Sequence, residues 1–471
     1  MLNRWLLSIA TVAATALPLA GCGGDAARPN VVLIVVDSLR ADALGSYGSE
    51  PTPSPAIDHL AAEGVRFERA VAPASWNLPS VSSLVTSTPP WVHGQGAPPS
   101  GAREVITLAG SFAAAGYRTG AFTEMAWPLL QRDFGTFQNT AFKDVFGSPD
   151  ANSAARTLEA ALEWARADDK APFFLLVHTY EVHSYFLGKP RHHELARDDQ
   201  PDYEGPFRDW AIRDLSQPAG PQVMAALLEA NEDDLAYVRA LYHAAVREMD
   251  LQVARFLEGL EEAGLDDRTV VALTSSNGEG FRPDLNRVHH GGRLHHDVLH
   301  VPLVVRWPGH LEPSVEPSVV TTLDLGPTLL ALAGLPEEAL FAGRSLVAPD
   351  TGLLSGLGGP RFHVPSLQKK QVVAQEAAFR ILPSGERAPA TSAQLALYYS
   401  DWVTFIDTGD GTELYDLKDD PEQERDLSAE HPDGVARLRE KVRGLAEQGA
   451  ESGAGPDPEQ LEQLRSLGYV Q

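Results

Sequence analysis

Cysteine and basic residues are scarce in this sequence. Only one of the 471 residues is a cysteine, so no disulfide can form within the chain. Lysine and arginine together number 38 against 64 aspartates and glutamates, which leaves a formal net charge of −26. A chain this acidic lacks the basic surface that nucleic acids require, and we therefore expect no nucleic-acid partner. The excess of acid is typical of a soluble protein in an extracytoplasmic or salty setting.

The residues that are plentiful predict a large α/β fold. Hydrophobic residues make up 43% of the sequence, enough for a sizeable core. Apolar, β-branched runs that predict strands alternate with amphipathic stretches that predict helices. The predicted strands are 31–36, 65–71, 117–122, 173–178, 269–274 and 301–306, and the predicted helices are 57–64, 108–116, 157–167, 235–263 and 326–334. This alternation predicts a doubly wound, mostly parallel sheet with helices on both faces.

The N-terminal segment has the features of a secretion signal. A basic residue precedes the apolar stretch 5–19, and a small-residue cleavage site, "LAGC", ends at Cys22. This arrangement resembles a bacterial lipobox, so we expect a signal peptide over 1–21, a tether over 22–28 and a lipid on Cys22. An ordinary signal peptide with an incidental cysteine, or a short membrane anchor, is the alternative, although the apolar stretch is short for a span. The expected location is the bacterial cell envelope, lipid-anchored and facing the periplasm, with Gly23 favouring the outer membrane.

Other segments predict smaller features. The polar, proline-rich insertion 186–222 could be a lid or surface decoration. After residue 346 the sequence becomes turn-rich, and 395–407 predicts an antiparallel hairpin. A final helix is predicted over 435–448.

Polar residues gather where the predicted strands end. In an open α/β sheet, ligands bind beyond the carboxyl ends of the strands, so these residues are candidates for a site. They are Asp37, Ser38, His178, His183, Ser276, Asn277 and the histidine-rich segment 286–300.

Seven blocks of the sequence resemble, in order, the sulfatase branch of the alkaline phosphatase superfamily. They are "RPNVVLIVVDSLRADALGSYG", "PASWNLPSVSSLVTS", "LVHTYEVHSY", "LTSSNGEG", "HHGGRLHHDVLHVPLVVRWPG", "LDLGPTLLALAGL" and "ELYDLKDDPEQERDL", and the ending "LRSLGYV" is similar too. The resemblance implies a sulfatase-like α/β domain over 29–345 and a smaller antiparallel subdomain over 346–448. Residues 449–471 would then be a linker and tail.

The resemblance also implies a nucleophile position, and here it carries an unexpected residue. Sulfatases build their nucleophile from cysteine or serine, oxidised to formylglycine, two positions before a proline, and phosphoester-cleaving relatives use threonine. Asn77 fills this position, and its amide is a poor nucleophile. Val81 stands where an arginine is usual, although that arginine is often absent when a tryptophan occupies this corner.

The metal ligands implied by the resemblance are depleted as well. The family uses two aspartates after the first strand, and an aspartate with histidine or asparagine after a later one. The corresponding residues here are Asp37, Ser38, Ser276 and Asn277, so one carboxylate remains. We expect no cofactor, or a weakly bound divalent metal such as Ca²⁺ or Zn²⁺, because affinity follows the charge of the ligands. Without a metal the nucleophile is not activated.

The surviving residues also have structural interpretations. Asp37 could cap a helix that begins near Leu39. His178, His183 and His290 match family positions that line the pocket and donate protons or contact the sulfate. Alternatively, they are ordinary core histidines.

Two further sets of residues could supply a new site. The first is His295, His296 and His300, and the second is Ser75, Ser80 and Ser83. The histidines have helical spacing and could form either a solvated face or a remodelled transition-metal site. The serines could act as relocated nucleophiles, but small residues at a helix start usually cap it, and no base is assignable to them.

The leading hypothesis is a membrane-tethered lipoprotein with a sulfatase fold, a pseudoenzyme in which catalysis is impaired or lost. It would bind an anionic ligand in the old pocket, such as a sulfated or phosphorylated small molecule or glycan. The alternative is an active sulfuric or phosphoric ester hydrolase that uses a remodelled metal site and a water nucleophile.

Overall fold

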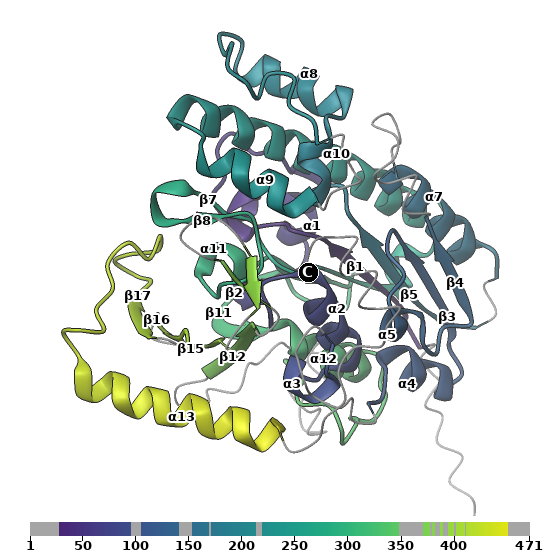
Figure 1. Ribbon diagram of the computed structural model, residues 1–471. Helices are drawn as coiled ribbons and strands as arrows, with labels where there is room; N and C mark the ends of the chain where they lie inside the picture. Colours follow the sequence, from purple (N-terminus) through teal and green to yellow (C-terminus); the bar gives the residue numbers. More distant parts are fainter. Residues whose placement is uncertain are drawn as a thin grey trace, which may run out of the picture.

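A nine-stranded mixed sheet forms the centre of the computed structural model (Figure 1). The structure describes residues 28–95, 105–140, 153–168, 171–212, 219–347, 371–376, 379–381, 387–389, 394–399, 402–409 and 411–450. The strand order is β11-β2-β10-β6-β1-β5-β3-β4, and β9 pairs with β2. The strands are β1 (Asn30–Val36), β2 (Val65–Val71), β3 (Arg118–Thr123), β4 (Thr136–Asn139), β5 (Phe173–Thr179), β6 (Thr269–Ser275), β9 (His300–Val301), β10 (Leu303–Arg306) and β11 (Ser314–Thr321).

Strand β1 lies in the middle of the sheet. It pairs in parallel with β5 on one side and β6 on the other, so Val31 lies beside Phe174 and Val270. Every residue of β1 is buried, which explains its continuous apolar run. Strand β10 runs antiparallel to both β6 and β2. The predicted mostly parallel sheet is therefore confirmed, with an antiparallel strand inside it.

Helices cover both faces of this sheet (Figure 1). On one face lie α1 (Pro55–Ala62), α7 (Ser153–Arg166) and α10 (Glu232–Glu262), and on the other α2 (Asn77–Thr86), α4 (Leu108–Ala114) and α12 (Leu325–Leu332). Further helices are α3 (Pro90–His93), α5 (Pro128–Gln131), α8 (Pro190–Asp199), α9 (Ala219–Leu228) and α11 (His296–Leu299). The long helix α10 begins with a capping box, in which Asn231 and Asp234 each accept the other's backbone N–H. It ends before Gly264, whose φ of +63° is left-handed.

A separate antiparallel sheet of order β12-β15-β16-β17 follows, as predicted for the C-terminal part. Its strands are β12 (Gln371–Glu376), β15 (Gln394–Tyr399), β16 (Val403–Asp407) and β17 (Thr412–Asp416), and β13 (Phe379–Ile381) pairs with β14 (Arg387–Pro389). Helix α13 (Pro432–Ala450) packs on this sheet through Val442, which joins a small core with Leu397 and Phe405. The predicted signal peptide, the lipidated Cys22 and the tail beyond residue 450 lie outside the described residues.

The single strand predicted over 301–306 is wrong. It is divided into β9 and β10 at Pro302, which has no N–H to donate to a neighbouring strand. Strands β4 and β11 were not predicted. Both lie at the ends of the strand order, and β11 contains Pro317 and an irregular register there.

Part of the insertion 186–222 belongs to the folded body. Helix α8 packs along α10. Lys189 Nζ donates to Glu181 at 2.7 Å, and His192 Nε2 lies 2.9 Å from the same carboxylate. All three side chains are buried, so this part of the insertion is fixed to the chain that leaves β5 and is not built as a free lid.

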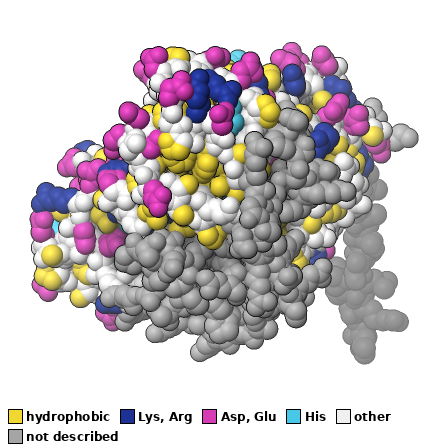
Figure 2. All heavy atoms as spheres, turned by 45° about the horizontal axis from the view of Figure 1, so that its top comes forward, with side chains coloured by type: hydrophobic (Ala, Val, Ile, Leu, Met, Phe, Trp, Pro, Cys, Tyr) yellow, Lys and Arg dark blue, Asp and Glu magenta, His cyan; other side chains and the backbone are white. Residues whose placement is uncertain are grey.

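The surface carries the acidity of the sequence. Figure 2 shows Asp and Glu side chains (magenta) spread over the described face, with Lys and Arg side chains among them. Within the part of the chain that the structure describes, no helix has the length and hydropathy needed to cross a membrane.

Candidate functional site

The polar residues after β1 and β6 meet at one edge of the sheet, together with the first residue of α2. Asn77 Nδ2 donates to Asp37 Oδ2 at 2.9 Å, and the Ser276 hydroxyl donates to Asp37 Oδ1. Ser276 Oγ also lies 2.8 Å from Asn277 Oδ1, and Asn277 Nδ2 donates to Ser38 Oγ at 3.3 Å. The structure thus brings together the five residues predicted at the nucleophile and metal positions.

The backbone after β1 is held in a specific turn. Ser38 has a φ of +59°, which is uncommon outside glycine. The Tyr242 hydroxyl, from α10, donates to the carbonyl of Ser38 at 2.7 Å and accepts from the N–H of Arg40 at 2.9 Å. Ser275 Oγ accepts from the N–H of Leu39 at 2.9 Å. These bonds fix the direction in which Asp37 and Ser38 leave the strand.

Asp37 does not cap a helix, so that interpretation is wrong. The next helical turn spans Ala41–Ala43, and it has no side-chain cap. Instead the carboxylate is fully buried and accepts from Asn77 and Ser276. Burial raises the pKa of Asp37 to about 6, although the hydrogen bonds from Ser276 and Asn77 act in the opposite direction.

The side chains around Asp37 do not fit the divalent cation that the family uses. A hard cation needs several oxygen ligands, and affinity grows with their charge. Here both oxygens of the one carboxylate, Asp37, already accept hydrogen bonds from Asn77 and Ser276. The amide N–H₂ of Asn77 and the hydroxyl of Ser276 supply positive partial charge where the cation would lie.

Asn77 is also fixed as part of α2. Its Oδ1 accepts from the N–H of Leu78 at 2.9 Å while its Nδ2 donates to Asp37. Both functions of the amide are therefore used in holding the start of the helix to the end of β1.

The three serines proposed as relocated nucleophiles are buried in or beside α2. Ser80 donates to the carbonyl of Ala74 at 2.8 Å, whereas Ser83 Oγ lies 2.8 Å from His93 Nε2. Because His93 Nδ1 accepts from Gln95, the neutral His93 ring carries its hydrogen on Nε2 and donates to Ser83, so His93 is no base for this serine and the prediction holds. Both Ser83 and His93 are 0% exposed, and His93 Nδ1 accepts from the N–H of Gln95 at 3.0 Å. This pair serves the packing of α2 against α3.

The predicted pocket histidines lie close to the polar residues around Asp37. Ser38 Oγ is 3.5 Å from His290 Nδ1, and the ring centroids of His183 and His290 are 5.0 Å apart. His178 lies at the end of β5, and burial lowers its pKa to about 3. Burial also lowers the pKa of His183 well below its usual value, and the nearby His290 and His289 add to this. His178 and His183 are therefore neutral at pH 7.

The second histidine set does not form one site. His295 Nε2 lies 2.9 Å from Glu413 of β17, whereas His300 Nε2 lies 3.0 Å from the carbonyl of Glu68. The rings of His296 and His300 stack with centroids 4.5 Å apart. His295 is buried and the other two are half-buried, so the prediction of a solvated face is wrong.

Two further residues lie against His290: Glu279, which sequence reasoning missed, and His289, which it named only as part of the segment 286–300. Glu279 Oε2 is 2.9 Å from His290 Nδ1, and Glu279 Oε1 is 3.3 Å from His289 Nδ1. Although burial raises the pKa of the Glu279 carboxyl, the two histidines outweigh it and hold that pKa well below its usual value. The signal in the sequence was the pairing of "NGEG" with "VHHGG", which becomes visible only when the two segments form a hairpin.

The whole cluster is closed to solvent. Asp37, Ser38, Asn77, Asn277, His178 and His290 are 0% exposed, Ser276 is 1% exposed and His183 is 6% exposed. Aromatic rings pack against its histidines: Trp127 lies 6.0 Å from His178, and Tyr180 lies 4.8 Å from His183, between ring centroids. A substrate could reach Asp37 or Asn77 only after these groups move.

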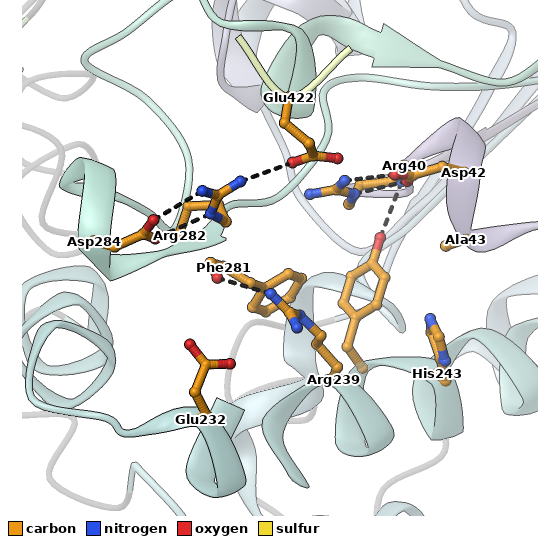
Figure 3. Close-up of a pocket in the computed structure, with 11 residues that line it drawn as sticks. Arg40, Asp42, Ala43, Glu232, Arg239, His243, Phe281, Arg282, Asp284 and Glu422 are labelled. Atoms are coloured by element: carbon orange, nitrogen blue, oxygen red, sulfur yellow. Dashed lines mark hydrogen bonds and ion pairs between the residues drawn. The ribbon is translucent and has the colours of Figure 1, made fainter. Parts of the chain in front are cut away.

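An open pocket of about 500 Å³ lies beside this cluster (Figure 3). Arg40 lies between the pocket and the buried cluster. Its side chain lines the pocket, and its Nη1 donates to the carbonyl of Glu279 at 2.7 Å. The cations in the pocket are largely neutralised: Arg40 pairs with Asp42, and Arg282 pairs with both Asp284 and Glu422.

Comparison with known proteins places these features in a family context. The model of the family described as Sulfatase matches residues 29–335. Arylsulfatase A of Bos taurus is 28% identical over 368 residues, which cover 71% of this chain and 69% of that protein. N-acetylgalactosamine-6-O-sulfatase of Bacteroides thetaiotaomicron is 22% identical, over 90% of this chain and 94% of that protein.

Solved structures share the fold over almost the whole chain. The phosphonate monoester hydrolase of Agrobacterium radiobacter has a TM-score of 0.66 at 20% identity, and the match covers 92% of this chain and 100% of the hydrolase. A protein solved in complex with its substrate, D-glucosamine-2-N,6-O-disulfate, has a TM-score of 0.67 at 18% identity, with 94% and 99% covered. At these identities the likeness shows the fold.

Proposed function

Because the chain belongs to the sulfatase family, we propose that it keeps the family's scaffold while its ester hydrolase activity is lost or strongly impaired. One observation carries this proposal: the amide nitrogen of Asn77, at the nucleophile position, donates to Asp37 at 2.9 Å. The lone pair of an amide nitrogen is delocalised into its carbonyl, so this group cannot attack sulfur or phosphorus. The same bond occupies a carboxylate oxygen that a catalytic cation would need.

The test is turnover of p-nitrophenyl sulfate and p-nitrophenyl phosphate by the purified mature chain, with and without added Ca²⁺ or Zn²⁺. We expect no turnover above the background of a buffer blank. The variant Asp37→Ala tests the site, and Glu258→Ala, an exposed change on α10, is the matched control. Robust turnover that Asp37→Ala abolishes and Glu258→Ala preserves would show that the proposal is wrong.

A second candidate is an active sulfuric or phosphoric ester hydrolase with a remodelled metal site and a water nucleophile. The buried group of Glu279, His289 and His290 favours it, since Ser38 links this group to Asp37 through a 3.5 Å contact with His290. In the same assay, this candidate requires turnover that depends on Zn²⁺ and disappears in Glu279→Gln.

The anionic ligand of the hypothesis requires a separate test. Relatives named above act on sulfated sugars, and a sulfated or phosphorylated small molecule or glycan is the corresponding ligand class here. However, Asp37, Glu124 and Glu279 are buried carboxyl groups in the segments that follow β1, β3 and β6, and burial lowers the pKa of His178 to about 3. We expect glucosamine 6-sulfate to cause no measurable rise in melting temperature, and a saturable rise would restore the anionic ligand.

We also propose that the mature chain is held in the bacterial cell envelope by a lipid on Cys22, on the strength of the lipobox-like "LAGC".

A further inference from the structure

Glu279, His289 and His290 form a compact group, of which only His290 matches a position that the family resemblance assigns to the pocket. One ligand atom from each of them lies within 4.8 Å of the other two. Glu279 and His290 are 0% exposed and His289 is 2% exposed. Burying a carboxylate with two imidazoles is unfavourable unless their charges are matched, so this grouping requires a physical reason.

A short hairpin places these three residues. Strand β7 (Phe281–Arg282) pairs with β8 (Arg287–Val288), and the pairing continues because Gly280 and His289 exchange two backbone hydrogen bonds, at 3.1 and 2.9 Å. Glu279 and His290 are the next residues on the two sides. A side chain at Gly280 would lie 2.7 Å from the carbonyl oxygen of Arg287 and 2.8 Å from that of His289, so only glycine allows this close pairing.

Two arginines hold the backbone of the group from outside. Arg40 Nη1 donates to the carbonyl of Glu279 at 2.7 Å, and Arg293 Nη2 donates to the carbonyl of His289 at 3.0 Å. His289 itself has a φ of +59°, a left-handed conformation that residues other than glycine rarely adopt. Such positions persist where the surroundings fix them, and they concentrate at functional sites.

The spacing of the side chains can be compared with that around a tetrahedral ion. Zinc binds histidine nitrogen and carboxylate oxygen at about 2.0–2.2 Å, which sets tetrahedral ligand atoms roughly 3.3 Å apart. The two histidine nitrogens lie 3.3 and 2.9 Å from the two different oxygens of Glu279, and one ligand atom from each of the three residues lies within 4.8 Å of the others, so these atoms need to move closer together to hold one ion. The ring of His183 also lies beside the group, 5.0 Å from His290 and 6.3 Å from His289 between centroids.

We propose that Glu279, His289 and His290 bind one transition-metal ion of the zinc class. Two imidazoles and one carboxylate are the donor set such ions prefer, whereas Ca²⁺ and Mg²⁺ prefer oxygen alone. The site adjoins the family's metal position, because Ser38 Oγ lies 3.5 Å from His290 Nδ1, but its three ligands are not the residues at that position. It does not rest on the loss of hydrolysis, since metal binding and turnover are measured separately.

The experiment is zinc titration of the purified mature chain by calorimetry, followed by elemental analysis after dialysis. We expect one zinc per chain. Glu279→Gln and His289→Gln should weaken binding by at least about 100-fold, because loss of groups that merely support metal ligands already costs 10–100-fold. His295→Gln and His296→Gln are the matched controls and should keep the zinc. A wild-type chain without stoichiometric zinc, or zinc retained in both ligand variants, would overturn the proposal, as would loss of zinc in the control variants.

Loss of zinc in a variant could also result from misfolding, so a second experiment uses a variant that gains an absorption band. With Co²⁺ in place of zinc, His289→Cys should add a thiolate-to-cobalt charge-transfer band in the near ultraviolet, while the wild-type chain shows none. Because the chain has only one natural cysteine, Cys22→Ala in the same background removes every other source of this band. A folded His289→Cys protein that takes up Co²⁺ without the band would place the metal elsewhere.

Discussion

The side-chain amide of Asn77 performs two structural tasks at the nucleophile position. It donates from Nδ2 to Asp37 and accepts at Oδ1 from the N–H of Leu78. Neither amide atom can attack, because the lone pair of the nitrogen is delocalised into the carbonyl. Ser276 adds a second donor to Asp37, so the buried carboxylate is neutralised by dipoles where the family uses a cation.

Restoring the family's residues should therefore require several changes at once. Ser276→Asp alone sets a second carboxylate against the buried Asp37 and should destabilise the fold without restoring turnover. The combination of Ser38→Asp, Ser276→Asp and Asn77→Cys, made with a formylglycine-generating enzyme, supplies both ligand charge and nucleophile. We expect turnover of an aryl sulfate only in the triple variant with added Ca²⁺, because residues that act as a unit are not additive. A single variant as active as the triple one would contradict this.

His93 allows a test of pH dependence at a single residue. Its ring is fully buried against Ser83, and burial lowers its pKa from 6.5 to about 3. The unfolded chain therefore binds a proton here below about pH 6.5 while the folded chain does not, so stability is complete above that pH and is lost as the pH falls toward 3. This residue should lower the unfolding free energy by about 1–3 kcal/mol between roughly pH 7 and pH 4.5. Urea denaturation of wild type and His93→Gln at several pH values measures this change in the unfolding free energy. If that free energy depends on pH equally in the two proteins, His93 is not the residue responsible.

Helix α1 depends on a neighbouring helix for its first turn. Ser54, at its N-cap, makes no side-chain cap, but Asp250 of α10 accepts from the N–H groups of Ala56 at 3.1 Å and Ile57 at 2.8 Å. Asp250→Ala leaves both groups without this acceptor and should lower the unfolding free energy by about 1–3 kcal/mol. The exposed change Glu258→Ala on the same helix should shift it by less than about 0.5 kcal/mol. Equal midpoints and slopes in urea for the two variants would contradict the cap.

Elements were predictable where their pattern is local. Helix α10 was predicted over 235–263 from its amphipathic pattern and β1 over 31–36 from its apolar run, because both patterns lie within the element itself, whereas the capping residue Asn231 that sets the true start at Glu232 was not used. Strand β11 was missed because its first half is exposed and pairs with β2 across a long stretch of chain. The positions of Asp37 and Asn77 could be predicted because both residues lie in sequence blocks that resemble the family. The contact of Glu279 with His289 could not, because it arises from a hairpin whose two-residue strands are too short to show a periodic pattern.

At the scale of the whole molecule, the polar cluster is buried inside the fold, whereas the acidic side chains lie on the surface. The cluster is assembled from β1, α2, β5, β6 and the β7–β8 hairpin, so it exists only in the folded chain. The surface carries the net charge of −26, which repels anionic surfaces at low salt and keeps chains apart (Figure 2). Any stable attachment to a membrane must therefore come from a part other than this surface.

The lipid on Cys22 is the group we expect to provide that attachment. Each methylene that enters the bilayer contributes about 0.8 kcal/mol, so acyl chains can hold a large protein that its own charge would keep away. In cells, wild-type protein should remain with the membrane fraction after washing in high salt and be released by detergent, whereas Cys22→Ala should be recovered in the soluble fraction. High salt is the informative wash, because it removes proteins held by charge and leaves those held by acyl chains. Anionic vesicles added to purified Cys22→Ala should bind none of it, since the acidic surface offers them no attraction. Equal release of both proteins as soluble material would show that Cys22 carries no anchor.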